Sequence, residues 1–304
     1  MTSDEQYSLT LEYYVAGFFD LLGQQEHLRN LRQLPGKDDA SALARTREDL
    51  KNTYGAVLGM RKLFASAFDS YARKPLATDS FTPEQRAVYL QMNNNPIQFY
   101  GFSDSMLVFL SVRTTDAAKL PARGVLGIIV AAALTAIGTL GVGHPIRGGI
   151  DLGVGFQPKE GEFYGPALSR AYTLESRMAD YPRIVVGDEL ITYLQQTHNN
   201  PASDAFATES KSIAGDCTNC IALDDDGMPF IDYLGPYFRQ LLGKAGDATF
   251  IDEAYQQVVR FANRFKQEKN SKLAFRYTLL RNYFEARLPL WADLPRKGNK
   301  RIPT

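Results

Sequence analysis

Two apolar runs on either side of a short polar turn form the clearest pattern in the chain. Residues Gln98–Phe102 and 106–110 are almost wholly apolar, and Ser103, Asp104 and Ser105 stand between them. Such runs around a tight polar turn predict a β-hairpin between two buried strands. Hairpin tips lie at the surface, so Asp104 is expected there. A lone aspartate at such a tip can also be an ordinary turn former.

A second carboxylate stands at the end of another apolar run. Residues 11–19 are rich in aromatic and aliphatic side chains, which is typical of a central strand, and Asp20 follows them directly. Two carboxylates at the ends of adjacent strands can bind hard divalent cations, which prefer oxygen ligands and bridge phosphate groups. Asp20 and Asp104 are therefore candidate metal ligands, provided that their strands are neighbours.

The remaining pattern alternates helices and strands. Apolar residues recur at helical spacing over 37–73, as one long helix or two, and over 84–92. Strands are expected at 144–156 and 183–186, a polar loop at 199–215, and a second hairpin around the Asp-Gly turn at 226–227. Further helices are expected up to residue 287. This order predicts an α+β fold, a mixed sheet with helices packed against it.

One segment raises the question of a membrane. Residues 125–143 carry no charged side chain, and a bilayer-spanning helix needs about 20 such residues. The segment is rich in glycine and alanine and lies between two predicted strands. We therefore expect a buried, closely packed helix rather than stable insertion into a membrane.

The composition of the chain limits the classes of binding partner that are expected. Lysine plus arginine and aspartate plus glutamate both number 34, so no net charge points to nucleic acid or an anionic membrane surface. The polar start of the chain lacks a secretory signal pattern, and a cytoplasmic location is expected. Cys217 and Cys220 form one C-x-x-C without enough further ligands for zinc, so ordinary loop thiols are expected. The aspartates at 224–226 are expected to form a solvated turn rather than a calcium loop.

Several short motifs occur in an order that resembles class III nucleotidyl cyclases. They are FFDLLG at 18–23, FSDS at 102–105, PIRGGIDLGVG at 145–155, EFYGPALSRAYTLE at 162–175 and YPRIVV at 181–186. FSDS, RGGI, GPAL and PRI are most similar to the pyrimidine cyclases of bacterial antiphage (Pycsar) systems. The resemblance implies a ferredoxin-like centre of the sheet, two Mn²⁺ or Mg²⁺ ions, and a homodimer in which the two subunits share the active sites.

The resemblance also implies roles for individual residues. Asp20, Leu21 and Asp104 would hold the metals, and the backbone of Leu22 and Gly23 would cradle the phosphates. Two arginines in or beside strands would contact the phosphates, each with an alternative: Arg147 a structural salt bridge, and Arg183 an exposed charge at a strand edge.

The helix after Gly165 departs from the family pattern. Ser169 and Thr173 stand where many class III cyclases carry Asn and Arg, and neither supplies a cation. Arg170 and Arg177 lie three and four residues from Thr173, so both are expected on its helical face. They are candidates for stabilising the transition state, and surface charges are the alternative.

Two further positions bear on the base. Tyr100 stands four residues before Asp104, where purine cyclases resembling this chain carry a Lys or Glu, and its ring takes up room that a purine needs. Glu162 can accept a hydrogen bond from a pyrimidine. We therefore expect a pyrimidine substrate, UTP first and CTP second. The alternative is that Tyr100 only packs in the sheet.

The resulting hypothesis is a cyclase-like domain at 1–235, with a helical insertion at about 28–95 and a helical extension at 236–304. It would make a 3′,5′-cyclic pyrimidine nucleotide as a second messenger in antiphage defence, read by a separate cyclic-nucleotide effector. Three alternatives stay open: a catalytically silent domain that binds a nucleotide or a partner, a purine nucleotide cyclase, and a polymerase-palm-like enzyme that makes dinucleotides.

Overall fold

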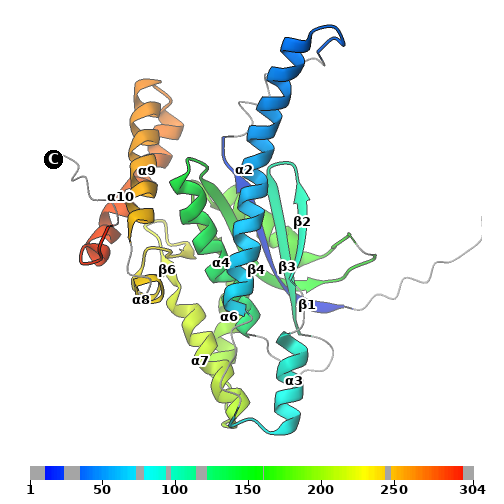
Figure 1. The fold of residues 1–304 in the computed structure, drawn as a ribbon. Coiled ribbons are helices and arrows are strands. Elements are labelled where there is room, and N and C mark those ends of the chain that lie inside the picture. Colours follow the sequence, from blue (N-terminus) through cyan, green and yellow to red (C-terminus); the bar gives the residue numbers. More distant parts are fainter. Residues whose placement is uncertain are drawn as a thin grey trace, which may run out of the picture.

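Seven strands form one mixed sheet, in the order β2-β3-β1-β4-β5-β7-β6 (Figure 1). The computed structural model describes residues 11–23, 35–72, 79–93, 97–113, 122–159, 161–243 and 248–296. The strands are β1 Glu12–Leu21, β2 Gln98–Phe102, β3 Ser105–Arg113, β4 Ile146–Gly155, β5 Ile184–Val186, β6 Ile221–Leu223 and β7 Pro229–Ile231. Both hairpins expected from the sequence, β2–β3 and β6–β7, are confirmed.

The centre of the sheet has a β-α-β-β-α-β connectivity. β1 lies between β3 and β4 and is antiparallel to both, and β2 pairs with β3. This arrangement is the ferredoxin-like one that the resemblance implied. β5 then adds parallel to β4. The expected mixed sheet with packed helices is confirmed.

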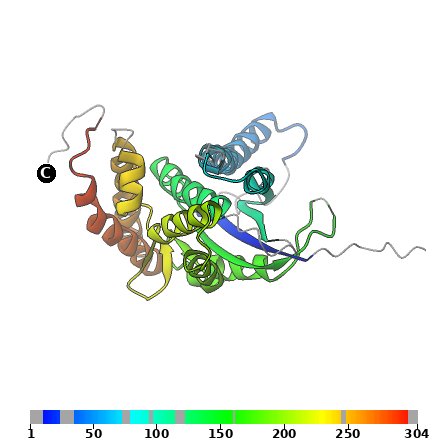
Figure 2. The ribbon, with the colours of Figure 1, turned by 90° about the horizontal axis from the view of Figure 1, so that it is seen from below.

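Two long helices cover one face of this sheet, and a shorter helix packs on the other face. The helices are α2 Ala40–Ala72, α3 Pro83–Asn93, α4 Ala122–Gly141, α5 Pro166–Thr173, α6 Asp188–His198, α7 Ala205–Asn219, α8 Pro236–Gly243, α9 Thr249–Gln267 and α10 Ser271–Arg287, with a π-helical turn η1 Leu174–Met178 and a 3-10 turn η2 Leu288–Trp291. α2 and α4 lie on the same side of the sheet (Figure 2) and pack on inward-facing residues such as Val15, Phe19 and Val108. Of the two alternatives for the segment that begins at 37, one helix is observed, because α2 is continuous from Ala40 to Ala72.

Helix α4 is the segment with the membrane-like composition. Among the described helices it is the one long and apolar enough to cross a membrane, and most of it is buried inside the protein. Thr135 and Thr139 donate their hydroxyl hydrogens to carbonyl oxygens one turn earlier, those of Ala131 and Thr135. A buried core helix, as expected, therefore accounts for its composition.

The polar loop expected at 199–215 is wrong, because most of it is helix α7. Asp204 caps this helix by accepting the N–H groups of Phe206 and Ala207. Apart from Ile213, the buried residues are small or polar, including Ala214 and Cys217, so the period of large apolar side chains that signals a helix is weak. Cys217 therefore lies within a helix and Cys220 at its C-cap, both buried, and the expectation of loop thiols is also wrong.

The C-terminal helices pack on the core through some of their aromatic residues. Tyr277 and Phe284 of α10 are buried against α9 and its surroundings, whereas Phe275 is 65% exposed. α9 and α10 lie side by side at one end of the molecule (Figures 1 and 2). The tail from 297, the segment at 24–34 and the chain before residue 11 lie outside the described residues.

Candidate active site

Three polar side chains form a row across the end of the sheet. Asp20 on β1 pairs in register with Ser105 on β3 and with Arg147 on β4, so the three lie on one face, away from α2 and α4. The Ser105 hydroxyl donates to Asp20 Oδ1 at 2.8 Å, and Arg147 Nη2 lies 3.7 Å from Asp20 Oδ2. The predicted adjacency of the two strands is thus confirmed, although Asp20 stands inside β1, one residue before its end.

Asp104 lies beside this row, in the turn between β2 and β3. Its carbonyl oxygen accepts the N–H of Leu21 at 3.2 Å, which ties the hairpin tip to the end of β1. Burial raises the pKa of Asp20; the Ser105 hydrogen bond lowers it, the charge of Asp104 raises it and Arg147 lowers it. The charge of Asp104 thus opposes ionisation of Asp20, and a bound cation would relieve this repulsion.

Glu175 is a further carboxylate at this end of the sheet, to which sequence reasoning assigned no role. It comes from η1, is 3% exposed, and its Oε1 lies 2.6 Å from Arg147 Nε. A Cβ on Gly149 would lie 2.4 Å from the Ala171 carbonyl oxygen, so this glycine lets α5 and η1 approach β4. Glu175 ends the motif EFYGPALSRAYTLE, which was the one available signal.

Burial raises the pKa of Glu175 to about 7. The charge of Arg147 lowers this pKa, and the charge of Asp20 raises it. The folded state therefore holds a proton between about pH 4.5 and 7 that the unfolded chain has released. Stability from this group is present at low pH and is lost as the pH rises through 7.

We expect Glu175→Gln to flatten this pH dependence. Denaturant unfolding in buffer with a metal chelator should give a wild-type free energy that falls, relative to the variant, by about 2 kcal/mol between pH 5 and 8. The variant cannot ionise, so its own curve lacks this step. Parallel curves for the two proteins across that range would contradict the assignment.

The phosphate cradle expected from the backbone of Leu22 and Gly23 stays a prediction, and the N–H of Leu22 already has a partner within the fold. The N–H of Leu21 is bonded to Asp104, and that of Leu22 is bonded to the carbonyl oxygen of Pro145 at 2.9 Å. Gly23 has φ of +90°, a left-handed conformation that glycine adopts readily. The residues after it lie outside the described part of the chain.

Arg183 is buried rather than exposed at a strand edge, so that alternative is wrong. Its side chain is 2% exposed; Nη1 contacts Asp224 Oδ2, and Nη2 contacts Asp226 Oδ2 at 2.5 Å. Nη2 also donates to the carbonyl oxygen of Met178 at 2.8 Å. Asp224 and Asp226, expected only as part of a solvated turn, therefore neutralise a buried cation. The phosphate role of Arg183 stays a prediction and requires it to leave these partners.

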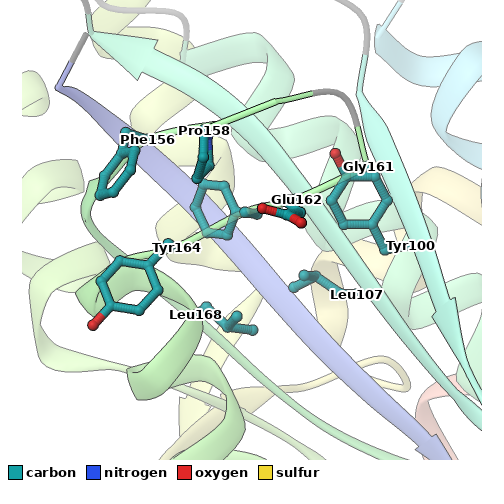
Figure 3. A pocket seen from close by; sticks show the side chains of 9 residues that line it. Tyr100, Leu107, Phe156, Pro158, Gly161, Glu162, Tyr164 and Leu168 are labelled. Carbon is teal, nitrogen blue, oxygen red and sulfur yellow. The ribbon is translucent and has the colours of Figure 1, made fainter. Parts of the chain in front are cut away.

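The two candidate base-reading residues line one pocket of about 570 Å³, together with Leu107, Phe163 and Leu168 (Figure 3). Glu162 is exposed, pairs with Lys159 at 2.9 Å and projects toward Tyr100 (Figure 3).

Two glutamines lie beside Tyr100, and the sequence pattern did not indicate either as a site residue. Gln157 Nε2 donates to the Tyr100 hydroxyl at 3.1 Å, and the Gln98 and Gln157 amides pair with each other at 2.6 and 2.8 Å. Amide groups can meet the polar edge of a base. The Tyr100 ring also packs edge-on against Phe109, with centroids 5.1 Å apart, so packing and lining the pocket coexist.

A second pocket of about 810 Å³ adjoins the first, and both include Tyr164 and Leu168. Ser169 and Arg170 line it, but Arg170 also pairs with Glu189 at 2.9 Å. Arg177 is exposed and lies in the π-helical turn, where the spacing that placed it on the face of Thr173 does not hold.

The donor set around Asp20 and Asp104 fits a divalent cation. Carboxylate oxygens suit Mg²⁺ and Mn²⁺, and a cation would offset both the burial and the mutual repulsion that raise the pKa of Asp20. Among the described residues no three His, Cys, Asp or Glu side chains lie together as a metal-binding group. Further ligands would thus come from main-chain oxygens such as that of Leu21, from water and from substrate phosphates.

No protein-family model matches the chain, and no curated sequence matches it. Among solved structures, the chain is similar to a bacterial light-regulated adenylyl cyclase, with 12% sequence identity and a TM-score of 0.35. The match covers 77% of this chain and 98% of the other. A likeness of this extent carries no argument about function, which rests on the side chains at the Asp20 end of the sheet.

Proposed function

We propose that this protein is a class III-type nucleotide cyclase that acts on a pyrimidine nucleoside triphosphate, UTP first and CTP second. One observation carries the proposal: Asp20 and the Tyr100–Glu162 pocket belong to the same face of the sheet, and Asp104 stands in the turn at the edge of that face. In the register, Tyr100, Leu107 and Phe18 form a row two residues inward from the row that holds Asp20. Two residues along a strand span about 7 Å, which suits a base and phosphates of one nucleotide.

The proposed reaction is the attack of the ribose 3′-hydroxyl on the α-phosphorus, which forms the cyclic phosphodiester bond and expels pyrophosphate. The pocket of Tyr100 and Glu162 would bind the base, and Ser169 in the adjoining pocket is available to the ribose. Arg147 stands beside Asp20 and can neutralise phosphate charge there. Arg170, from the adjoining pocket, is the second candidate for that role.

Asp20 and Asp104 would hold two Mn²⁺ or Mg²⁺ ions, which lower the pKa of the attacking hydroxyl and stabilise charge on the leaving oxygen. The contribution of the chain is to fix the two carboxylates. The Ser105 hydroxyl orients Asp20, and the Leu21 N–H holds the backbone of Asp104. Positioning and charge neutralisation of this kind supply most of the catalysis in phosphoryl transfer.

We expect purified protein with manganese to cyclise UTP fastest, then CTP, and ATP or GTP least, with products identified by mass. Tyr100→Ala should open space for the second ring of a purine. The ratio of kcat/KM for ATP to that for UTP should then rise at least about 10-fold, the size of a modest steric discrimination.

Tyr100→Phe is the matched control, because it keeps the ring and removes only the hydroxyl that Gln157 contacts. It should retain the exclusion of purines. Faster turnover of ATP or GTP than of either pyrimidine by the wild type, or an unchanged preference in Tyr100→Ala, would show that the base assignment is wrong.

We further propose that the protein acts as a cytoplasmic homodimer and that its product is a messenger in antiphage defence, read by a separate effector. Large aromatic side chains are exposed around the site face, where a second chain can cover them: Phe102 is 79% exposed, Tyr164 68% and Tyr172 52%. Sedimentation analysis tests the homodimer, and a monomer at micromolar concentration would count against it.

The second candidate function is a catalytically silent nucleotide-binding domain. It is favoured by the neutral Ser169 and Thr173 and by the engagement of Arg147 with Glu175. The incubation with the four nucleotides separates the two functions, because a silent domain binds a nucleotide without releasing pyrophosphate.

A further inference from the structure

Arg61, a residue of the helical insertion, contacts the hairpin tip that carries Asp104. Arg61 of α2 donates through Nη2 to the carbonyl oxygens of Ser103 at 3.3 Å and of Ser105 at 3.1 Å. These are the residues on either side of Asp104. α2 lies on the face of the sheet opposite to the Asp20 row, and Arg61 lines neither the Tyr100 pocket nor the pocket that adjoins it.

The contact between Arg61 and the turn requires a residue without a side chain at position 101 of β2. The guanidinium lies flat against Gly101, where an added Cβ would be 2.4 Å from Cζ and from Nη2. No other side chain fits at position 101 without displacing Arg61. Arg61 Nε is buried and has no hydrogen-bond partner among the described residues, so the two carbonyl oxygens are the polar contacts that compensate this cation.

The turn that Arg61 contacts is not a relaxed one. Ser103 has φ of +51°, in the left-handed region that residues other than glycine seldom adopt. Three successive carbonyl oxygens of the turn accept hydrogen bonds from outside the hairpin: those of Ser103 and Ser105 from the Arg61 side chain, and that of Asp104 from the Leu21 N–H. Loss of Arg61 removes two of these three bonds.

We propose that Arg61 is a positioning residue, which holds the hairpin turn so that the Asp104 carboxylate faces Asp20. The helical insertion is thereby coupled to the metal end of the site, and movement of α2 changes the affinity for metal. The inference rests on the proposed function for its catalytic consequence, but the coupling of Arg61 to the turn can be measured without catalysis.

The test uses the full chain with Arg61→Ala, Arg61→Lys and Gly101→Ala, and with Lys62→Ala as the matched control from the next, exposed position of α2. Two readouts are taken: Mn²⁺ binding without nucleotide, by electron paramagnetic resonance, and hydrogen exchange of peptides covering 98–113 and 18–23. Melting temperature serves as the check on folding.

We expect Arg61→Ala and Gly101→Ala to weaken Mn²⁺ binding about 10-fold and to speed exchange in both peptides. Arg61→Lys, which can reach one carbonyl, should lie between wild type and Arg61→Ala, and Lys62→Ala should match wild type. Gly101→Ala keeps the charge of Arg61, so a matching effect assigns the role to the contact.

Wild-type exchange and Mn²⁺ binding in folded Arg61→Ala would overturn the proposal. If the wild type cyclises no nucleotide, the proposed function fails, whereas the exchange comparison still decides whether Arg61 positions the turn. If Arg61→Ala does not fold, the comparison of Arg61→Lys and Gly101→Ala with wild type decides in the same way.

Discussion

Removal of either metal carboxylate should abolish cyclisation while the fold persists. For Asp20→Asn and Asp104→Asn we expect product formation at saturating manganese to fall at least about 10³-fold, since metal stabilisation of the reacting oxygens is worth several kcal/mol and each 1.4 kcal/mol is about tenfold. Asn keeps the shape of Asp20 and can still accept the Ser105 hydrogen bond. It removes the buried charge whose burial raises the pKa of Asp20, so stability should be unchanged or higher.

Asp225→Asn is the matched control, because Asp225 also stands in the turn of a hairpin but at the other edge of the sheet. It should cyclise nucleotides at the wild-type rate. Full activity of either Asp20→Asn or Asp104→Asn at saturating manganese would contradict the assignment of the two carboxylates to metal binding.

The second large effect concerns stability rather than catalysis. Arg183→Ala should lower the free energy of unfolding by about 3 kcal/mol, because removal of one partner from a buried ion pair leaves the other uncompensated. Arg183 is 2% exposed and joins the end of η1 to the β6–β7 hairpin through Asp224 and Asp226. Denaturant unfolding of the wild type and the variant measures the difference.

A surface pair supplies the control. Arg281→Ala removes an exposed i,i+4 pair with Glu285 and should cost less than about 1 kcal/mol. The Arg183 hydrogen bond lowers the pKa of Asp226, so its contribution is present above pH 3.8 and is lost as the pH falls below that value. Equal losses in Arg183→Ala and Arg281→Ala would show that the buried network contributes nothing beyond a surface pair.

The sequence by itself determined the elements with a strong local pattern. The turn at Ser103–Ser105 and the apolar segments of β1 and α4 each carry their signal within about ten to twenty residues, because the period of apolar positions depends only on local backbone geometry. The placement of two aspartates at strand ends followed from that pattern. The pattern did not predict helix α7, because apart from Ile213 its buried residues are small or polar and leave little hydrophobic signal in the sequence.

Only the tertiary structure decided which side chains meet. The register placed Ser105, Asp20 and Arg147 in one row, and the close approach of η1 at Gly149 brought Glu175 beside Arg147. The pairings of Arg183 with Asp224 and Asp226, and of Arg61 with the hairpin backbone, join residues about forty positions apart. Such contacts depend on strand order and on packing between layers, and no local period of the sequence encodes either one.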